Sequence, residues 1–375
     1  MCSSDLVKRL LIGTYRPIRA PVWSGFHLRN WIVQRCVRLV PWGLLEATHF
    51  QHMLLRALGA RIGERVHLHR GVTLLEGGWD LLTIGDDAAV GQDAGLAIVT
   101  LVDGQIAMDT VTLGVRSTVE TRAAVEGGAS LGEGAELTAW SYLPSGRHVP
   151  DGERWDGVPA EPAGPASLPP AVDRSRDLSP VAHGLALVGG RLLLALFLAL
   201  PLQALILVAA LVQGLDAAMF LEWLYHPLNE ARYWVLEAAL VVLAVPATLA
   251  FEALAMRLLG RSEAGALSRF GTRYVRLRLK TETLESAGRW LCGTLLWPVW
   301  LRAAGMRVGR RSEVGTLIDT VPEQVEIGSE TFFADGIYLC GPRVSQGTVD
   351  VAPVRIGDEA FFGDRKSTRL NSSHT

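Results

Sequence analysis

The chain has 375 residues, which is enough for two or three domains rather than a single core. Its formal net charge of −2 at pH 7 argues against nucleic-acid binding by phosphate neutralisation, so no nucleic acid is expected among its partners. Hydrophobic residues make up 49% of the sequence, a share that points towards membrane segments. The four cysteines are scattered without a C-x-x-C pair, so neither a disulfide framework nor a metal site is predicted.

Both ends of the chain differ in character from the rest. Residues 1–6, MCSSDL, and residues 365–375, RKSTRLNSSHT, resemble short tails left in translated sequence assemblies. A genuine polar tail is the alternative for the second of these segments. We therefore expect both ends to lie outside the fold, and the chain to be an internal piece of a longer protein.

Residues 7–58 are expected to form an amphipathic helical segment. From Trp31 to Leu58 the sequence mixes Arg with Trp and Leu, as helices that lie in a membrane interface do. A helix that simply packs over the end of the following domain is the alternative.

Residues 59–165 carry one aliphatic anchor in every six positions. Positions six apart fall on different faces of an α-helix, and a half-buried strand needs apolar residues at every second position. A parallel β-helix with three short strands in each coil of about 18 residues fits this period. The small residue after an anchor, such as Gly114 or Gly132, is expected to turn the corner with a positive φ. The anchors are Ile84, Val90, Leu96, Leu113, Val119, Val125, Leu131, Leu137 and Leu143.

One segment interrupts this period. Leu96 and Leu113 are separated by five residues more than two hexapeptides, so we expect a loop extruded from one corner of the coil. A stack of coils exposes strand edges at both ends, and the preceding helix and the closing ERWDGVPAEPAG are expected to cap it. A sandwich of short strands is the alternative fold.

Two apolar runs follow a linker at residues 166–182. Leu192–Leu215 contains no charged residue, and Ala238–Met256 contains only Glu252, while a bilayer-spanning helix needs about 20 residues. We expect two transmembrane helices within residues 183–258, with a buried helical hairpin as the alternative. Basic residues flank both runs but are scarce between them, which indicates a multi-pass plasma-membrane protein with both β-helices in the cytoplasm.

The sequence after the apolar runs repeats the sequence before them. TIGDDAAVGQDAGL at Thr83–Leu96 parallels EIGSETFFADGIYL at Glu326–Leu339, and the next anchor follows at the same spacing in both copies. Equal spacing in divergent copies indicates duplication. We therefore expect a basic linker and amphipathic helix at residues 259–304, and a second, truncated β-helix at residues 305–364. Its anchors are Val308, Val314, Ile327, Phe333, Leu339, Ile356 and Phe362.

These repeats, closed by Gly157-Val158-Pro159-Ala160, resemble those of left-handed β-helix acyltransferases. Together with the apolar hairpin, MDTVTLG at Met108–Gly114 and FFADGIYLCGPRVSQGTVDVAPVRIG at Phe332–Gly357, they resemble the C-terminal membrane region of nonribosomal peptide synthetases of the poly-lysine synthetase type. The resemblance covers nearly all of Leu11 to Asp364. It implies a mainly β protein in which a transmembrane α-helical hairpin separates two left-handed parallel β-helix domains of hexapeptide repeats.

The resemblance also implies an activity and its partners. The modules are expected to assist acyl transfer, forming amide bonds on amino acids tethered to an aminoacyl or peptidyl carrier domain at the lipid bilayer. A phosphopantetheine-linked acyl group or CoA is the expected cofactor, and no metal is indicated. A further β-helix is a candidate stacking partner in a pseudo-trimer. The residues expected along the pantetheine arm are Trp155, Gly157, Pro159 and Ala160.

Acyl transfer to an amine needs a general base, usually a histidine, and donors that stabilise the oxyanion. His67 and His69 are two positions apart and hence on one face of a strand. Asp103 and Asp109 lie in the extruded loop, where the resemblance leads us to expect a histidine that this sequence lacks. These four residues are the catalytic candidates, although a solvent-exposed histidine pair without a task is the alternative.

Asp335 and Tyr338 are the candidates in the second copy. Two other functions compete with acyl transfer by a synthetase. One is a non-catalytic membrane scaffold whose β-helices dock a carrier protein, which the missing loop histidine favours for the first domain. The other is a free-standing, CoA-dependent hexapeptide acyltransferase.

Overall fold

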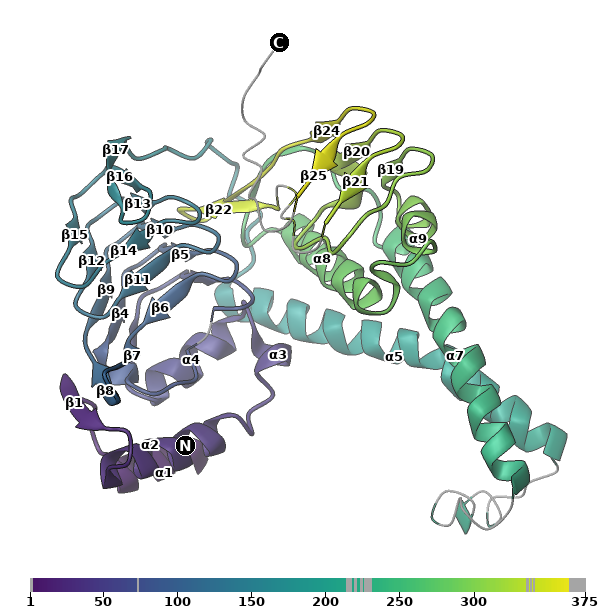
Figure 1. Ribbon diagram of the computed structural model, residues 1–375, viewed down its shortest axis with the longest axis horizontal. Coiled ribbons are helices and arrows are strands. Elements are labelled where there is room, and N and C mark those ends of the chain that lie inside the picture. Colours follow the sequence, from purple (N-terminus) through teal and green to yellow (C-terminus); the bar gives the residue numbers. More distant parts are fainter. Residues whose placement is uncertain are drawn as a thin grey trace. The chain divides into compact units, whose positions relative to one another are not determined.

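The structure, a computed structural model, describes residues 3–72, 74–213, 231–334 and 341–363, together with 218, 221–222, 225, 337 and 339 (Figure 1). The predicted tail at residues 365–375 and the candidates Asp335 and Tyr338 lie outside the described residues. The chain forms two compact units. The first unit is Met1–Val188 with Ala264–Val275 and Pro342–Val351, and the second is Gly189–Glu263 with Arg276–Gly341 and Ala352–Thr375.

Four helices precede the first coil, and the last of them caps it. Arg56 donates from Nε to the Ile62 carbonyl at 2.7 Å and from Nη2 to the Gly63 carbonyl at 2.8 Å, which fastens the final helix to the first strand. Leu55 on this helix is buried in the core of the first β-helix, so α4 packs over the end of the coil. The helices are α1 (Ser3–Leu11), α2 (Gly25–Val37), α3 (Trp42–Leu45) and α4 (His49–Ala57).

The expectation for residues 1–6 needs a correction. Residues 3–6 begin α1, and Asp5 in its first turn is buried and paired with Arg9 at 2.9 Å. An acidic residue at a helix N-terminus and an ion pair between positions four apart both favour the helical conformation.

The first β-helix stacks short parallel strands with the predicted period. Val119 pairs with Val90 one coil before it and with Leu137 one coil after it, and all three side chains are buried. The six predicted anchors from Leu113 to Leu143 are likewise buried, so each side of the coil sends one aliphatic side chain to the axis.

Three sheets form the sides of this stack. The six-stranded sheet runs β17 (Glu161–Pro165), β16 (Glu153–Asp156), β13 (Glu136–Leu137), β10 (Thr118–Val119), β5 (Ala89–Val90) and β3 (His67–Leu68). The five-stranded sheet runs β15 (His148–Val149), β12 (Ser130–Leu131), β9 (Val111–Leu113), β4 (Leu82–Ile84) and β2 (Arg61–Ile62), and the 3₁₀ turn Trp79–Leu81 precedes β4. The third sheet runs β14 (Tyr142–Leu143), β11 (Ala124–Glu126) and β6 (Gly95–Ala97). At the far end, β17 closes the stack by pairing antiparallel with β16.

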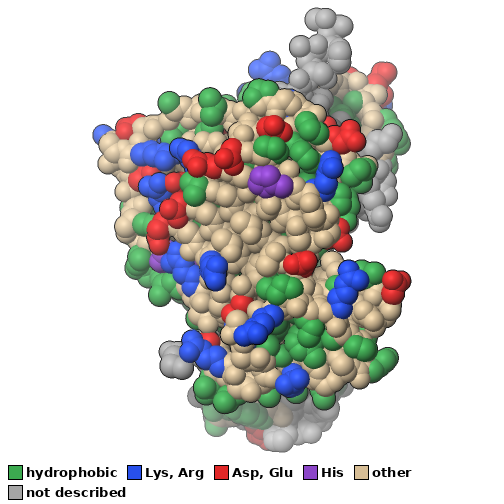
Figure 2. All heavy atoms as spheres, turned by 90° about the vertical axis from the view of Figure 1, so that its left-hand side faces the viewer, with side chains coloured by type: hydrophobic (Ala, Val, Ile, Leu, Met, Phe, Trp, Pro, Cys, Tyr) green, Lys and Arg blue, Asp and Glu red, His purple; other side chains and the backbone are tan. Residues whose placement is uncertain are grey.

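The corners of the coil correct the role predicted for glycine. The positive φ falls three residues after the anchor, often on a charged residue, as at Arg116 (57°) and Arg122 (54°). Gly114 instead lies where coils approach closely, because a Cβ there would come 2.5 Å from the Gly132 carbonyl carbon. Several of these corner residues form exposed ion pairs, such as Arg116 with Glu133. Figure 2 shows basic and acidic side chains next to one another across one face of the molecule.

The predicted extruded loop is a β-hairpin. Strands β7 (Val99–Val102) and β8 (Gln105–Met108) pair antiparallel, and β1 (Ile18–Pro21) adds a third strand to them. The turn between the hairpin strands places Asp103 and Gly104 at positive φ.

Among the described residues, the second β-helix repeats this plan with fewer coils. Its predicted anchors Val314, Ile327 and Phe333 are buried in one core with Trp297. Its elements are α8 (Thr272–Leu291), α9 (Trp297–Ala303), β19 (Arg307–Val308), the 3₁₀ turn Pro322–Gln324, β20 (Val325–Ile327), β21 (Phe332–Phe333), β24 (Val354–Ile356) and β25 (Phe361–Phe362). Its own hairpin, β22 (Arg343–Ser345) and β23 (Thr348–Val351), pairs with β18 (Gly265–Ser268) and belongs to the first unit.

Two long apolar helices, α5 (Pro180–Gln213) and α7 (Ala231–Leu258), connect the copies. Each contains a stretch that is long and apolar enough to cross a membrane, Pro180–Leu211 and Ala238–Leu258. The rings of Phe197 and Phe251 lie 5.2 Å apart, so the two helices contact one another.

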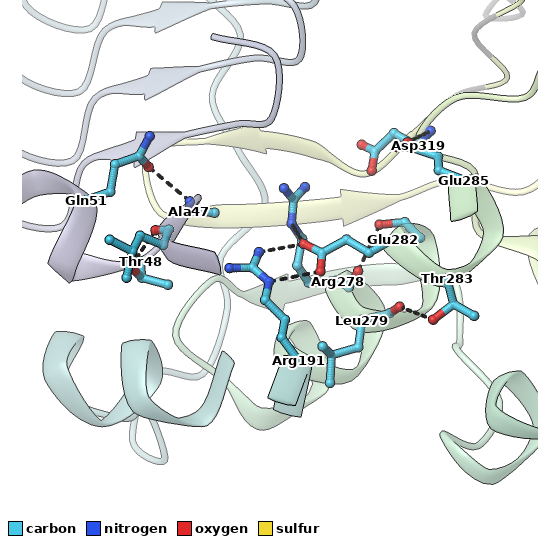
Figure 3. A network of polar contacts seen from close by, with 12 residues as sticks. Ala47, Thr48, Gln51, Arg191, Arg278, Leu279, Glu282, Thr283, Glu285 and Asp319 are labelled. Carbon is cyan, nitrogen blue, oxygen red and sulfur yellow. Dashed lines mark hydrogen bonds and ion pairs between the residues drawn. The ribbon is translucent and has the colours of Figure 1, made fainter. Parts of the chain in front are cut away.

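An ion cluster joins Arg191 on α5 to α8 (Figure 3). Arg191 donates from Nη2 to Glu282 Oε1 at 2.6 Å and from Nε to Oε2 at 3.0 Å. Arg278 Nε lies 2.9 Å from the same Oε1, and its guanidinium is buried. One carboxylate therefore serves two guanidinium groups.

Candidate functional site

Strand β3 places His67 on the outer surface of the first β-helix. Its neighbour Leu68 is an inward-facing core residue, so the alternation of a strand directs His67 outward. His67 is nevertheless buried, because the segment after α7 lies over it. Arg269 contacts its ring directly, and the ring of Tyr274 lies 6.3 Å away.

The contact with Arg269 fixes what His67 can do. Arg269 donates from Nε to His67 Nδ1 at 2.8 Å and from Nη2 to the Ala47 carbonyl at 3.3 Å. Because Nδ1 accepts this bond, we assign the hydrogen of the neutral ring to Nε2. While the bond stands, His67 can donate through Nε2 but cannot take up a proton at Nδ1.

The structure brings His69 beside His67, as expected for residues two apart on a strand. The two ring centroids lie 5.5 Å apart in an edge-to-face arrangement, and His69 is also buried. The backbone N–H groups of both residues donate to the next coil, that of His67 to the Ala88 carbonyl and that of His69 to the Val90 carbonyl. A rigid strand therefore sets the position of each ring.

Sequence reasoning missed three residues of this cluster, because they come from distant segments. His183 at the start of α5 stacks on Tyr274 with ring centroids 6.0 Å apart, and it lies 5.3 Å from the ring of Phe270. Arg269 appeared in the sequence only as part of the basic flank of the second apolar run, and Tyr274 was not singled out. No periodic signal links these positions to β3.

His52 on α4 adds a buried histidine near the same guanidinium. The pKa of His52 is lowered from 6.5 to about 3, mainly by burial and then by the positive charges of Arg269, His49 and Arg56. Burial and the nearby positive charges disfavour a protonated His52, so the ring is neutral in the folded state.

His52 should make the first unit sensitive to acid. The unfolded chain binds a proton at His52 below about pH 6.5 and the folded chain does not, so stability falls as the pH drops towards 3. At pH 5 the expected loss is about 2 kcal/mol, measured as the shift in urea unfolding followed by Trp fluorescence. The variant His52→Gln should lose this part of the pH dependence, whereas a change at the exposed His148 should retain it. Identical pH profiles for the wild type and His52→Gln would contradict the assignment.

Beyond the histidines, the outer face of the six-stranded sheet holds an acidic pair. Arg343 on β22 lies 2.6 Å from Glu120 Oε1 through Nε and 2.9 Å from Glu136 Oε1 through Nη2. Both carboxylates are also tied to backbone N–H groups, Glu120 to that of Ala139 and Glu136 to that of Ser167. The hairpin β22–β23 is thereby fixed on the coil.

The two aspartates of the extruded loop lie in a different sheet from the histidines. Asp103 is exposed at the tip of the β7–β8 hairpin. Asp109 at its base is also exposed, and its Oδ1 accepts a bond from the Thr110 backbone N–H at 2.7 Å. The structure therefore does not gather the four predicted catalytic residues into one site.

The closing loop combines buried and exposed residues. Trp155 faces the core, with its Nε1 bonded to Glu153 at 2.9 Å, and Ala160 is fully buried. Pro159 and the neighbouring Val158 face solvent. Within the described residues, no group of three or more His, Cys, Asp or Glu side chains is arranged to hold a metal ion.

No family model matches this chain. The chain is 28% identical over 371 residues to the delta-poly-L-ornithine synthetase of Acinetobacter baumannii (strain AB307-0294). The match covers 96% of this chain but 27% of the relative, so the chain spans about a quarter of the relative's length. The resemblance to a polyamino-acid synthetase is confirmed.

Solved structures that resemble parts of the chain include acetyltransferases, one of them described as containing hexapeptide repeats. One, from Vibrio cholerae O1 biovar eltor, was complexed with acetyl coenzyme A; it is 17% identical, with a TM-score of 0.26, covering 29% of this chain and 62% of that one. A maltose O-acetyltransferase from Clostridium difficile 630 is 10% identical, with a TM-score of 0.30, covering 43% of this chain and 97% of that one.

Proposed function

We propose that the chain is the membrane region of a polyamino-acid synthetase and takes part in amide-bond formation on carrier-tethered amino acids. The observation that carries this proposal is the match to a synthetase along 96% of the chain. The parallel coils with an extruded hairpin agree with a hexapeptide-repeat transferase scaffold. We assign the coils a left-handed sense.

Within this proposal, His69 is the general base and His67 its neighbour. A carrier-linked or CoA-linked thioester supplies the activated acyl group when bound, along the edge of Pro159 in the closing loop. The amine nitrogen attacks the thioester carbonyl, and the C–N bond forms as the C–S bond breaks. His69 accepts the proton that the amine loses and returns it to the leaving thiolate. His67 keeps its Nε2 hydrogen, because Arg269 occupies its Nδ1, and it can donate that hydrogen to a developing oxyanion. Asp103 and Asp109 contribute negative charge at the β7–β8 hairpin, which lies in a different sheet from the histidines.

We further propose that α5 and α7 cross the bilayer. In the most apolar stretch of each helix, only 6% and 28% of the residues are buried within the structure, unlike a core helix of a soluble protein. The basic flanks then place both β-helices on the cytoplasmic side of the plasma membrane.

A second candidate function is a non-catalytic scaffold that docks the carrier. The burial of both histidines favours this alternative, because His67 and His69 are only 1% and 5% exposed. In this case the cluster around Arg269 holds α4, β3 and the segment after α7 together, and the closing loop provides a surface for the carrier.

Turnover by the whole chain separates these two functions. The chain is reconstituted in lipid vesicles with an aminoacyl-pantetheine thioester and a free amino acid, and the dipeptide is measured by mass spectrometry. If His69 is the base, His69→Ala should reduce the rate at least about 100-fold. A change at the exposed His148, which bonds Ser130 on another sheet, serves as the control and should reduce it less than about twofold.

Each other outcome has a defined meaning. Unchanged turnover in His69→Ala would remove His69 from the mechanism. A wild-type chain that binds a carrier protein without forming product would favour the scaffold.

A further inference from the structure

The chain turns from α8 into α9 through an uncharged run, residues 290–301, which we call the apolar corner. Arg289 precedes this run and Arg302 follows it. A mainly apolar run of about 10–14 residues is too short to cross a bilayer, and it is typical of a buried core helix or of a segment in a membrane interface. The two possibilities differ in how much of the run the protein itself covers.

The protein covers only part of the apolar corner. Trp297, Trp300 and Leu301 are buried in the core of the second β-helix. Four other large apolar side chains are between 56% and 93% exposed, and they are Trp290, Leu295, Leu296 and Val299. A cluster of exposed apolar side chains marks a surface that contacts a partner or a membrane. The corner is therefore more than a core element.

The first copy shows that capping a β-helix does not require an apolar corner. Arg302 on α9 donates from Nε to the Val308 carbonyl at 2.8 Å and from Nη2 to the Gly309 carbonyl at 2.6 Å. Arg56 on α4 binds the first strand of its own β-helix in the same way. When these two arginines are aligned, the positions of Cys292, Leu295, Trp297 and Pro298 are occupied in the first copy by Glu46, His49, Gln51 and His52. The apolar character of the corner therefore serves something other than the cap.

The corner lies alongside the end of the apolar stretch in α7 (Figure 1). Trp300 donates from Nε1 to the Leu249 carbonyl at 2.8 Å. Arg257 donates from Nε to the Ala303 carbonyl at 3.0 Å. Leu249 comes nine residues before Leu258, the last residue of the stretch, which is about 13 Å along a helix. One leaflet of the hydrocarbon core is about 15 Å thick, so a contact at Leu249 falls within one leaflet when α7 crosses the bilayer.

The charged side chain in this part of α7 is hidden, whereas the corner leaves apolar side chains uncovered. Glu252 is only 3% exposed, and Ser286 on α8 hydrogen-bonds to its carboxylate. A carboxylate that faced lipid would be costly, because acyl chains offer neither a cation nor a hydrogen-bond donor. Polar groups covered by protein and apolar groups left open are what a surface in contact with lipid requires.

We propose that the apolar corner is inserted among the acyl chains of the cytoplasmic leaflet, next to α7. This inference rests on the proposed crossing of the bilayer by α7 and adds a membrane contact outside the two crossing helices. The indole of Trp290 and the guanidinium of Arg289, at the start of the corner, are groups that favour the level of the lipid headgroups. Because Arg302 holds the first coil, insertion of the corner fixes the second β-helix at the membrane surface.

Spin-label accessibility in vesicles of phosphatidylethanolamine and phosphatidylglycerol tests the insertion. The native cysteines of the full chain are replaced by serine, and a nitroxide is attached through Leu295→Cys, through Val242→Cys on α7 or through Leu168→Cys in the linker. All three native side chains are exposed in the structure. Power saturation measures collisions of the label with oxygen, which concentrates among acyl chains, and with a water-soluble nickel chelate.

A label on the corner should meet oxygen and avoid the chelate. At Leu295 the collision rate with the chelate should be at least about tenfold below that at Leu168, because a polar chelate is excluded from hydrocarbon. The collision rate with oxygen should be higher at Leu295 than at Leu168. Val299→Cys, on α9 itself, provides a second label and should repeat the result for Leu295.

The label at Val242 separates this inference from the crossing on which it rests. A shielded Val242 together with a Leu295 as open to the chelate as Leu168 would overturn the insertion and leave the crossing intact. A Val242 as open as Leu168 would overturn the crossing, and the insertion with it. A Leu295 label shielded from both oxygen and the chelate would show that protein rather than lipid covers the corner, which also overturns the proposal.

Discussion

Replacing Leu113 by aspartate should unfold the first unit, because this side chain points to the axis of the coil. Leu113 is buried in the core that contains every coil of the first β-helix. A carboxylate there has no cation or donor, and we expect a loss of more than about 4 kcal/mol of unfolding free energy. Urea unfolding followed by Trp fluorescence, with Trp79 in the same core, measures the change.

The neighbouring residue provides the control for this prediction. Thr112 lies on the same strand, β9, but faces solvent, since successive residues of a strand point to opposite faces. Thr112→Asp should change the unfolding free energy by less than about 1 kcal/mol. Equal losses in both variants would show that the coil does not have the inward and outward faces described here.

Replacing Glu282 by glutamine should destabilise the second unit strongly. The carboxylate binds Arg191 through two hydrogen bonds and Arg278 through a third contact, as Figure 3 shows. The neutral amide leaves two largely buried guanidinium groups without this charge, and removing one partner of such a cluster costs about 3–5 kcal/mol. Thermal unfolding in detergent micelles should show the loss, and Glu282→Asp should recover part of it.

An exposed ion pair in the same unit gives the comparison. Arg311 and Glu330 pair across adjacent coils of the second β-helix, with both side chains largely open to water. Glu330→Gln should cost less than about 1 kcal/mol, because exposed pairs are screened and gain little. Similar losses at Glu282 and Glu330 would mean that burial does not amplify the first pair.

The coil could be predicted from the sequence because its determinants are local. One anchor in six sets the sides of the prism. The irregular spacing between Leu96 and Leu113 indicated an extruded loop, since an extra segment cannot fit inside a coil of fixed length, but it did not show that the loop is a hairpin. The role of glycine was misassigned for a physical reason. The spacing shows that a small residue is needed beside the anchor. It does not show whether the reason is a positive φ at that residue or the close approach of a neighbouring coil.

The cluster around His67 could be predicted only in part. The pair His67 and His69 followed from the alternation of a strand. Arg269 lies about 200 residues further along the chain, and its contact with His67 depends on how a later segment folds back over the first coil. The docking of β22 on the first β-helix could not be predicted either, because no sequence pattern relates Arg343 to Glu120.

Both hairpins are inserted at the same point of the repeat. The first lies between the anchors Leu96 and Leu113, and the second lies between the anchors Leu339 and Ile356. The stacking of the anchor residues therefore does not depend on the sequence of the hairpin. Residues at the hairpin tip can be substituted without changing the shape of the coil. Duplication of such a unit yields two β-helices with the same kind of core, and the hairpin of each can change in sequence independently of the other. Thr100 on the first hairpin matches Arg343 on the second. The two hairpins therefore already differ in the charged groups that they can bind.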